Sequence, residues 1–77
     1  MEANEILEYL DVDLGVQTDD IAVDTLLFSD GLIDSFALVN LMMFIEKNAG
    51  IKIDAGEVNL ENFDTIERML AYIARQQ

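Results

Sequence analysis

The pattern of apolar and polar positions along the chain predicts helices and no β-strand of useful length. Over residues 2–10, apolar side chains recur at helical spacing with glutamates on the opposite side, which is typical of a short amphipathic helix. The clearest helix is predicted over about residues 35–48, and Gly50 follows it where a left-handed C-terminal cap is expected. Residues 51–58 predict at most one helical turn, near residues 55–58.

The last helix is predicted to begin after Asp64. Residues Asp64 to Glu67 form a capping-box pattern, in which two side chains satisfy the free backbone amides at the start of a helix. Apolar residues then repeat at i, i+3, i+4 and i+7, which predicts one buried face. These residues are Ile66, Met69, Leu70 and Ile73.

Residues 11–34 show no such periodicity. They include seven aspartates, whose side chains compete with helix hydrogen bonding, and two glycines, Gly15 and Gly31. A connection of this length is unusual inside a compact domain and points to a functional loop. Five apolar side chains are expected to tie it to the core: Ile21, Val23, Leu26, Leu27 and Phe28. We therefore predict an ordered loop.

The helix over residues 35–48 is apolar on more than one side. One stripe is predicted to face the core and consists of Leu38, Leu41, Met42 and Ile45. A second stripe, about 130° away around the helix, consists of Phe36, Val39 and Met43. Either a neighbouring loop covers this second stripe, or it is exposed and awaits a partner. Aromatic and methionine residues are favoured at interfaces, which suits the second interpretation.

Composition narrows the possible functions. The chain has 77 residues, 52 % of them apolar, which suffices for one small domain over residues 1–77. Sixteen acidic against four basic residues give a net charge of −12, which excludes ordinary nucleic-acid binding and disfavours anionic lipid surfaces. The chain has neither cysteine nor histidine, so a disulfide scaffold, a zinc site of the usual ligands, a thiol nucleophile and a histidine-based triad are excluded. We expect no catalytic residue.

Location and metal binding follow from the same composition. No apolar run is long enough to span a bilayer and the N-terminus is acidic, so we predict no membrane insertion and no signal peptide, and expect a cytoplasmic protein.

The aspartates of the long loop suggest a calcium site, which we tested against the EF-hand pattern. An EF-hand loop starting at Asp11 would need an oxygen ligand at Gly15, a glycine at Val16 and a glutamate at Ala22. All three positions fail, and no metal site is predicted.

The start of the helix at Ser35 is the one place that suggests chemistry. The first amides of a helix lack internal partners and carry partial positive charge, so a phosphate attached to Ser35 would lie where negative charge is favoured. The alternative is that Asp34 or Ser35 serves only as the N-cap, a common role for both residue types.

Residues 27–36, Leu-Phe-Ser-Asp-Gly-Leu-Ile-Asp-Ser-Phe, resemble the attachment motif of acyl carrier proteins. The resemblance covers nearly the whole chain in size, acidity, helix order and long first loop. It implies an all-α, acyl-carrier-like bundle of three main helices plus a short third helix. It also implies that Ser35 receives 4′-phosphopantetheine and that Asp34 helps to present the site to a Mg-dependent phosphopantetheinyl transferase. Phe36 stands where the family usually has leucine.

The resemblance implies a carrier, not an enzyme, that holds an acyl or aminoacyl group as a thioester. Its expected partners are the transferase, an acyl- or aminoacyl-ligase and downstream transferases, and a monomer is expected. Fatty-acid carriers usually have several acids on the helix after the serine, whereas here Glu46 is the first. The aliphatic helix also resembles D-alanyl and aminoacyl carriers, so both pathways stay open, with Phe36, Val39 and Met43 as the expected partner surface. The alternative is a non-carrier helical interaction module that uses the same apolar face.

Overall fold

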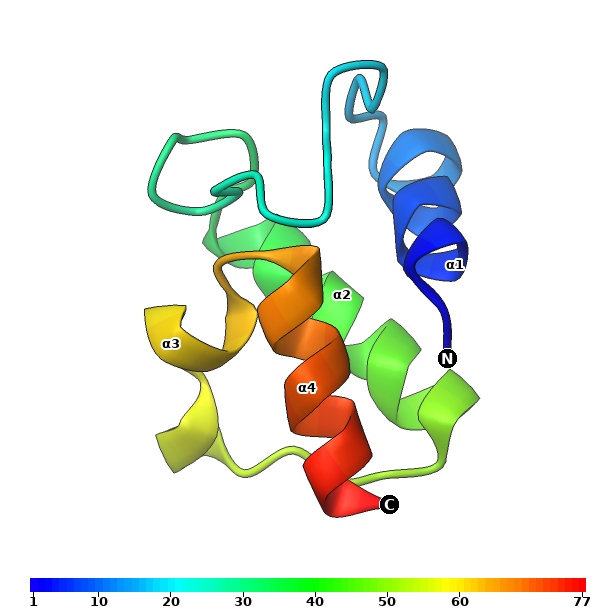
Figure 1. Cartoon of the computed structure of the whole chain (residues 1–77), viewed down its shortest axis with the longest axis vertical. Helices are drawn as coiled ribbons and strands as arrows, with labels where there is room; N and C mark the ends of the chain where they lie inside the picture. Colours follow the sequence, from blue (N-terminus) through cyan, green and yellow to red (C-terminus); the bar gives the residue numbers. More distant parts are fainter.

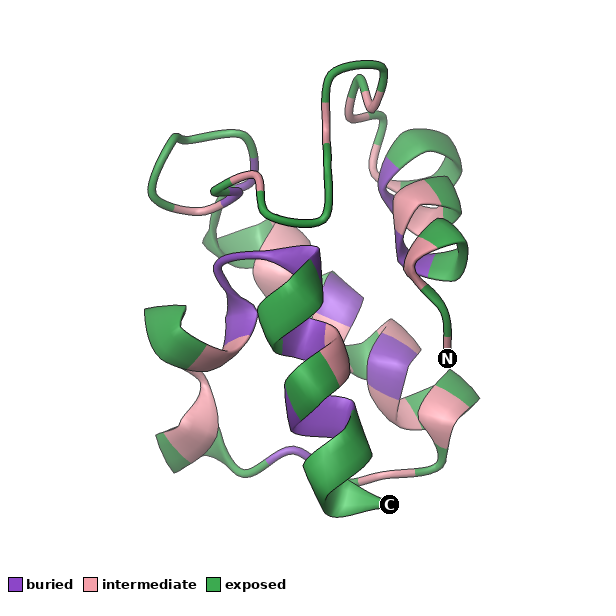
Figure 2. Cartoon of the chain, viewed as in Figure 1, coloured by how far each residue is buried: buried purple, intermediate pink, exposed green.

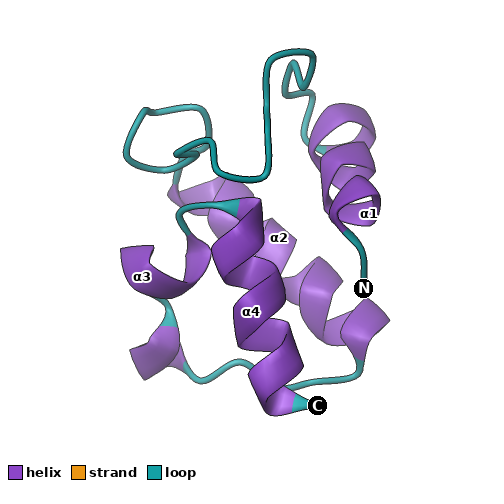
Figure 3. Cartoon of the chain, viewed as in Figure 1, coloured by secondary structure: helices purple, strands orange, loops and turns teal.

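The computed structural model describes all residues, 1–77, as a bundle of four α-helices without a β-strand (Figures 1 and 3). The helices are α1 (Ala3–Glu8), α2 (Ser35–Ala49), α3 (Leu60–Phe63) and α4 (Ile66–Gln76). A π-helical turn, Tyr9–Asp13, continues α1, and a 3₁₀ turn, Ala55–Glu57, precedes α3. The all-α prediction of three longer helices and a short third one is confirmed.

The first helical segment is longer than its sequence pattern predicts. The pattern ends near residue 10, but the π-helical turn extends the helical path to Asp13, where Leu14 N–H bonds to the Tyr9 carbonyl at 3.2 Å. Leu10 lies within this turn and is fully buried. Burial of Leu10 thus outweighs the poor helix propensity of the aspartates around it, and the long loop begins at Leu14.

Twelve apolar side chains from every part of the chain form one core. They are Ile6, Leu10, Leu27, Ile33, Leu41, Ile45, Ile53, Phe63, Ile66, Met69, Tyr72 and Ile73. Tyr72 of α4 is the largest, and it packs against the Phe63 ring at 5.2 Å between centroids. Its hydroxyl donates to Glu57 Oε1 at 3.1 Å, which satisfies the buried polar end of the ring. Figure 2 shows buried segments of α2 and α4 that face one another.

Phe44 lies on a side of α2 outside both stripes, and this side packs on the π-helical turn that continues α1. The rings of Tyr9 and Phe44 are stacked, with centroids 4.2 Å apart, and the Tyr9 hydroxyl donates to the Asn40 carbonyl at 3.2 Å. At its C-terminal end α2 stops at Gly50, whose φ of +68° confirms the predicted left-handed cap. The Glu46 carboxylate accepts a hydrogen bond from Ile53 N–H at 2.8 Å and fixes the segment that follows.

The predicted start of the last helix is wrong by one residue, and the short third helix lies later than predicted: residues 55–57 form only a 3₁₀ turn, and α3 spans Leu60–Phe63. Thr65 is the N-cap of α4, with its hydroxyl accepting from Arg68 N–H at 3.0 Å. Asp64 lies before the cap, and its carboxylate bonds to the long loop instead. The four residues of α3 are too few to give a periodic pattern; Asn59 caps them by accepting from Asn62 N–H.

The long loop is ordered as predicted, and it arches over the ends of α2 and α4 (Figure 1). Of the five apolar residues that were expected to tie it to the core, Leu27 is fully buried, and Ile21 and Phe28 pack against the core. Val23 and Leu26 were expected to do the same, but they are exposed. None of the helices combines the length and apolar character needed to cross a bilayer.

Candidate functional site

Ser35 is the first residue of α2 and is exposed. The preceding residue, Asp34, is the N-cap: its backbone is extended, and its Oδ1 accepts from Ala37 N–H at 2.9 Å. The two residues therefore divide the roles that the sequence left open. Asp34 caps the helix, and the Ser35 hydroxyl is not needed for capping.

The surroundings of Ser35 favour a negatively charged substituent. It lies at the positive end of a 15-residue helix whose first turn contains no acidic side chain. A phosphate bonded to the Ser35 oxygen would therefore meet the helix dipole and the unpaired amides of the first turn. The geometry suits a phosphodiester at this position.

The loop that leads to Ser35 is bound to the junction of α3 and α4 by one carboxylate. Asp64 Oδ1 accepts from the amides of Phe28 and Ser29 at 2.8 and 2.9 Å, and Asp64 Oδ2 accepts from the Ser29 hydroxyl at 2.5 Å. The Asp64 carbonyl also accepts from Leu27 N–H at 2.7 Å. Three consecutive loop residues are thus held by a residue more than thirty positions later in the chain.

These contacts keep Asp64 ionised. Burial alone would raise the pKa of Asp64, but the hydrogen bonds from Ser29 and Phe28 and the charge of Arg68 outweigh it and lower that pKa below its usual value. Because the folded pKa is the lower one, the anchor stabilises the fold above the pKa of an unfolded aspartate. That contribution is lost as the pH falls through the folded pKa.

The backbone between this anchor and Ser35 is also hydrogen-bonded. The Leu27 carbonyl accepts from the amides of Leu32 and Ile33 at 2.8 and 3.2 Å, so the chain turns back on itself. Gly31 lies in the turn with a φ of +75°, a conformation that side chains other than glycine rarely adopt. Ile33 is buried, and Asp34 follows it directly.

The second stripe of α2 is exposed. Phe36, Val39 and Met43 are 81 %, 51 % and 59 % exposed, so the interpretation in which a loop covers them is wrong. On the core stripe, Leu41 and Ile45 are fully buried. The other two members, Leu38 and Met42, are half-buried against the core.

Three pockets flank α2, and the sequence predicted none of them. One, of about 370 Å³, includes Met43 of the second stripe. The other two differ in their linings. The first, of about 200 Å³, has an almost wholly apolar lining of Phe28, Leu38, Val58, Asn59, Leu60 and Phe63. Its wall includes Leu38, one turn after Ser35, so it can hold a small apolar group close to the start of the helix. The only sequence signal for it is the set of apolar residues that have no place in the helical stripes, Phe28, Val58 and Leu60.

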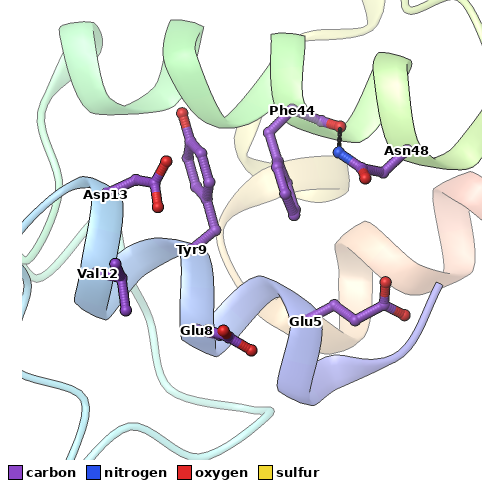
Figure 4. A pocket seen from close by; sticks show the side chains of 7 residues that line it. All are labelled: Glu5, Glu8, Tyr9, Val12, Asp13, Phe44 and Asn48. Carbon is purple, nitrogen blue, oxygen red and sulfur yellow. Dashed lines mark hydrogen bonds between the residues drawn. The ribbon is translucent and has the colours of Figure 1, made fainter.

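The second pocket, of about 280 Å³, lies between α1 and α2 (Figure 4). The rings of Tyr9 and Phe44 point into it, and the carboxylates of Glu5, Glu8 and Asp13 surround it. It contains none of the predicted site residues and lies towards the end of α2 opposite Ser35. No group of three or more aspartate or glutamate side chains in the structure is arranged to hold a metal ion.

Comparisons with known proteins agree with this geometry. Residues 4–73 match the family described as phosphopantetheine attachment site. A chain from a structure titled "Crystal structure of FAD-dependent dehydrogenase" is similar in fold, with a TM-score of 0.78 and 30 % sequence identity. The match covers 88 % of this chain and 97 % of that chain. No curated protein matches the chain at a significant level.

The division of roles between Asp34 and Ser35 gives a stability prediction. Asp34→Ala should lower the free energy of unfolding by about 1 kcal/mol, because it removes the N-cap of α2. Asp34→Asn keeps an acceptor and should stay close to wild type, and Ser35→Ala should change the stability by less than about 0.5 kcal/mol. Urea denaturation followed by circular dichroism measures all three. A larger loss for Ser35→Ala than for Asp34→Ala would contradict the assignment of the cap.

Proposed function

This chain belongs to the phosphopantetheine attachment family, and on that premise we propose that Ser35 is the residue that carries the prosthetic group. Members of the family are carrier domains that hold 4′-phosphopantetheine covalently and are not themselves catalytic. The observation that carries the proposal is the exposed Ser35 hydroxyl at the first position of α2, beside a residue that already caps the helix. The other serine, Ser29, donates its hydroxyl to Asp64 and precedes no helix.

The division of chemistry between chain and cofactor explains the composition. When bound, the arm supplies a thiol that can hold an acyl or aminoacyl group as a thioester. The chain needs only an exposed hydroxyl in a fixed position, since the transferase activates it. Tethering then raises the effective concentration of the carried group at each partner enzyme.

We further propose that synthetic enzymes and the ligase recognise the chain through Phe36, Val39 and Met43. Carrier domains of the family interact with a phosphopantetheinyl transferase and with synthetic enzymes. On this chain the exposed stripe that starts next to Ser35 is apolar, and Glu46, the first acid of α2, already binds Ile53 N–H. A partner that binds through salt bridges to acidic side chains on α2 would find only Glu46, which is already hydrogen-bonded. This supports a specialised acyl or aminoacyl carrier role.

The similarity to the chain from the structure titled FAD-dependent dehydrogenase supports a proposal about which class of enzyme acts as a partner. If 88 % of 77 residues, about 68, is 97 % of that chain, then that chain has about 70 residues. An all-α chain of this length lacks the parallel sheet that dinucleotide-binding folds use, so we propose that the likeness concerns a carrier that works with the dehydrogenase. By the same argument, a flavin-dependent dehydrogenase is a candidate partner of this chain.

A non-carrier interaction module that uses the apolar face of α2 is the competing proposal. This function would explain the exposed stripe. It would not explain the exposed Ser35 at the start of α2 or the match to the family, and it gives Asp34 no role beyond capping. Modification of Ser35 therefore separates the two functions.

The central prediction is a single modification at Ser35. Incubation with coenzyme A, Mg²⁺ and a broad-specificity phosphopantetheinyl transferase should add one phosphopantetheine group, observed by intact-mass spectrometry. Ser35→Ala should abolish the addition, whereas Ser29→Ala should retain a single site. Modification of folded Ser35→Ala would refute Ser35 as the site, and an unmodified wild-type chain would favour the interaction module.

The partner surface can be tested by adding charge to the exposed stripe. Met43→Glu should fold and be modified at Ser35 but be loaded poorly by the ligase, because the glutamate must lose its hydration at an apolar interface. Ala71→Glu adds the same charge at an exposed position on α4 and should load normally. Leu41→Glu should unfold the domain, because burying the charge of the glutamate in the core would cost several kcal/mol of folding free energy. Normal loading of Met43→Glu would show that the partner surface does not include this stripe.

The flavin partner can be tested on the loaded chain. The dehydrogenase of the matched structure would take a hydride and release a proton from the carried group, so the loaded chain should lose the mass of two hydrogens while the flavin is bleached. The unloaded chain should bleach nothing. If the loaded chain keeps its mass although the flavin is active on another substrate, this partner class is wrong.

A further inference from the structure

The chain buries one charged side chain that the carrier function does not use. Asp64 is 2 % exposed, and the only other buried polar residue, Thr65, caps α4. A buried carboxylate is unfavourable unless its oxygens are hydrogen-bonded. Here all of its side-chain bonds go to Phe28 and Ser29, so the interaction serves the loop and not the helix that Asp64 precedes.

The loop has few other means of being held before α2. Between residues 22 and 34 only Leu27 and Ile33 are buried, and residues 29–32 are all exposed. Apolar packing therefore fixes two points, and the path of the backbone between them depends on hydrogen bonds. Glu67 N–H donates to the Val23 carbonyl at 2.9 Å, before Leu27, and between Leu27 and Ile33 the bonds to Asp64 are the ones that join the backbone to the rest of the fold.

The contacts form a continuous route from Asp64 to the attachment residue. Asp64 holds residues 27–29 through four hydrogen bonds. The carbonyl of Leu27 then holds the amides of Leu32 and Ile33, and Asp34, the next residue, caps the helix that Ser35 begins. Every link in this route is a hydrogen bond or a peptide bond.

We infer that Asp64 is a positioning residue for attachment of the prosthetic group, because it holds the loop that presents Asp34 and Ser35 to the transferase. This inference rests on the proposed function of Ser35. The transferase must align the Ser35 oxygen with a phosphorus atom of coenzyme A, and a misplaced nucleophile reacts more slowly even when the chain is folded. Asp64 touches neither reactant and acts only through the loop.

The first test compares two neighbouring residues. The probe is coenzyme A with Mg²⁺ and a broad-specificity phosphopantetheinyl transferase, at a temperature where circular dichroism shows each variant folded. Asp64→Ala should lower kcat/KM for modification roughly tenfold or more. Thr65→Ala removes the cap of α4 and also lowers stability, but it does not touch the loop and should keep the wild-type rate.

Two substitutions that remove fewer hydrogen bonds keep the test decisive if Asp64→Ala does not fold. Ser29→Ala removes one of the three side-chain bonds at an exposed position, and Asp64→Asn keeps the Oδ1 acceptor; both should give intermediate rates. Thr25→Val is the matched control, because it removes another loop hydrogen bond, to Ala22 N–H, that is not on the route. It should be modified at the wild-type rate.

Hydrogen exchange supplies a readout that loss of stability alone would not give. In Ser29→Ala and Asp64→Asn, the amides of Leu32 and Ile33 should exchange faster while those of α2 keep their protection. Folded variants at Asp64 and Ser29 that are modified at the wild-type rate would overturn the inference and leave Ser35 as the site. A wild-type chain that is not modified at all would instead overturn the proposed function.

Discussion

One buried carboxylate binds the part of the long loop that leads to Ser35. A chain of 77 residues has a core of only twelve apolar side chains, and two of them, Leu27 and Ile33, come from the stretch that leads to Ser35. Charge-assisted hydrogen bonds to Asp64 provide the additional constraint, and they are stronger than bonds between neutral groups. The start of α2 is therefore fixed from two sides, by the core along the helix and by the α3–α4 junction through the loop.

The apolar character of α2 has a different cause on each of its sides. Leu41 and Ile45 belong to the core, Phe44 stacks on Tyr9 of the π-helical turn, and Phe36, Val39 and Met43 have no neighbour that covers them. A bundle this small cannot surround a 15-residue helix completely. An apolar face is thus left next to Ser35, the proposed attachment residue, and this neighbourhood is the reason that we propose the face as a docking surface.

Features set by local periodicity could be predicted, and features set by distant contacts could not. The pattern of residues within a few positions of one another predicted the core stripe of α2 and the Gly50 cap. It also predicted the second stripe, but left open whether this stripe is exposed or covered by a loop. Asp64 was misread because Asp-Thr-Ile-Glu satisfies a local capping pattern, while its true partners, Phe28 and Ser29, are 36 and 35 positions away. The extension of α1 through Asp13 likewise depends on the burial of Leu10 and not on propensity. The proposed attachment residue, Ser35, was suggested by a motif together with the helix that follows it.

The net charge of the chain and the exposed apolar stripe of α2 act over different distances. A net charge of −12 steers basic partners towards the chain over long range, and salt weakens that steering. The exposed stripe of α2 contributes little to this field because Phe36, Val39 and Met43 carry no charge, and contacts there form only at short range. Raising the ionic strength would therefore slow association with partners while leaving the lifetime of the bound complex nearly unchanged. If partners dock on the stripe as proposed, the chain would meet its enzymes through the charge on the rest of its surface and be retained by them through an apolar face.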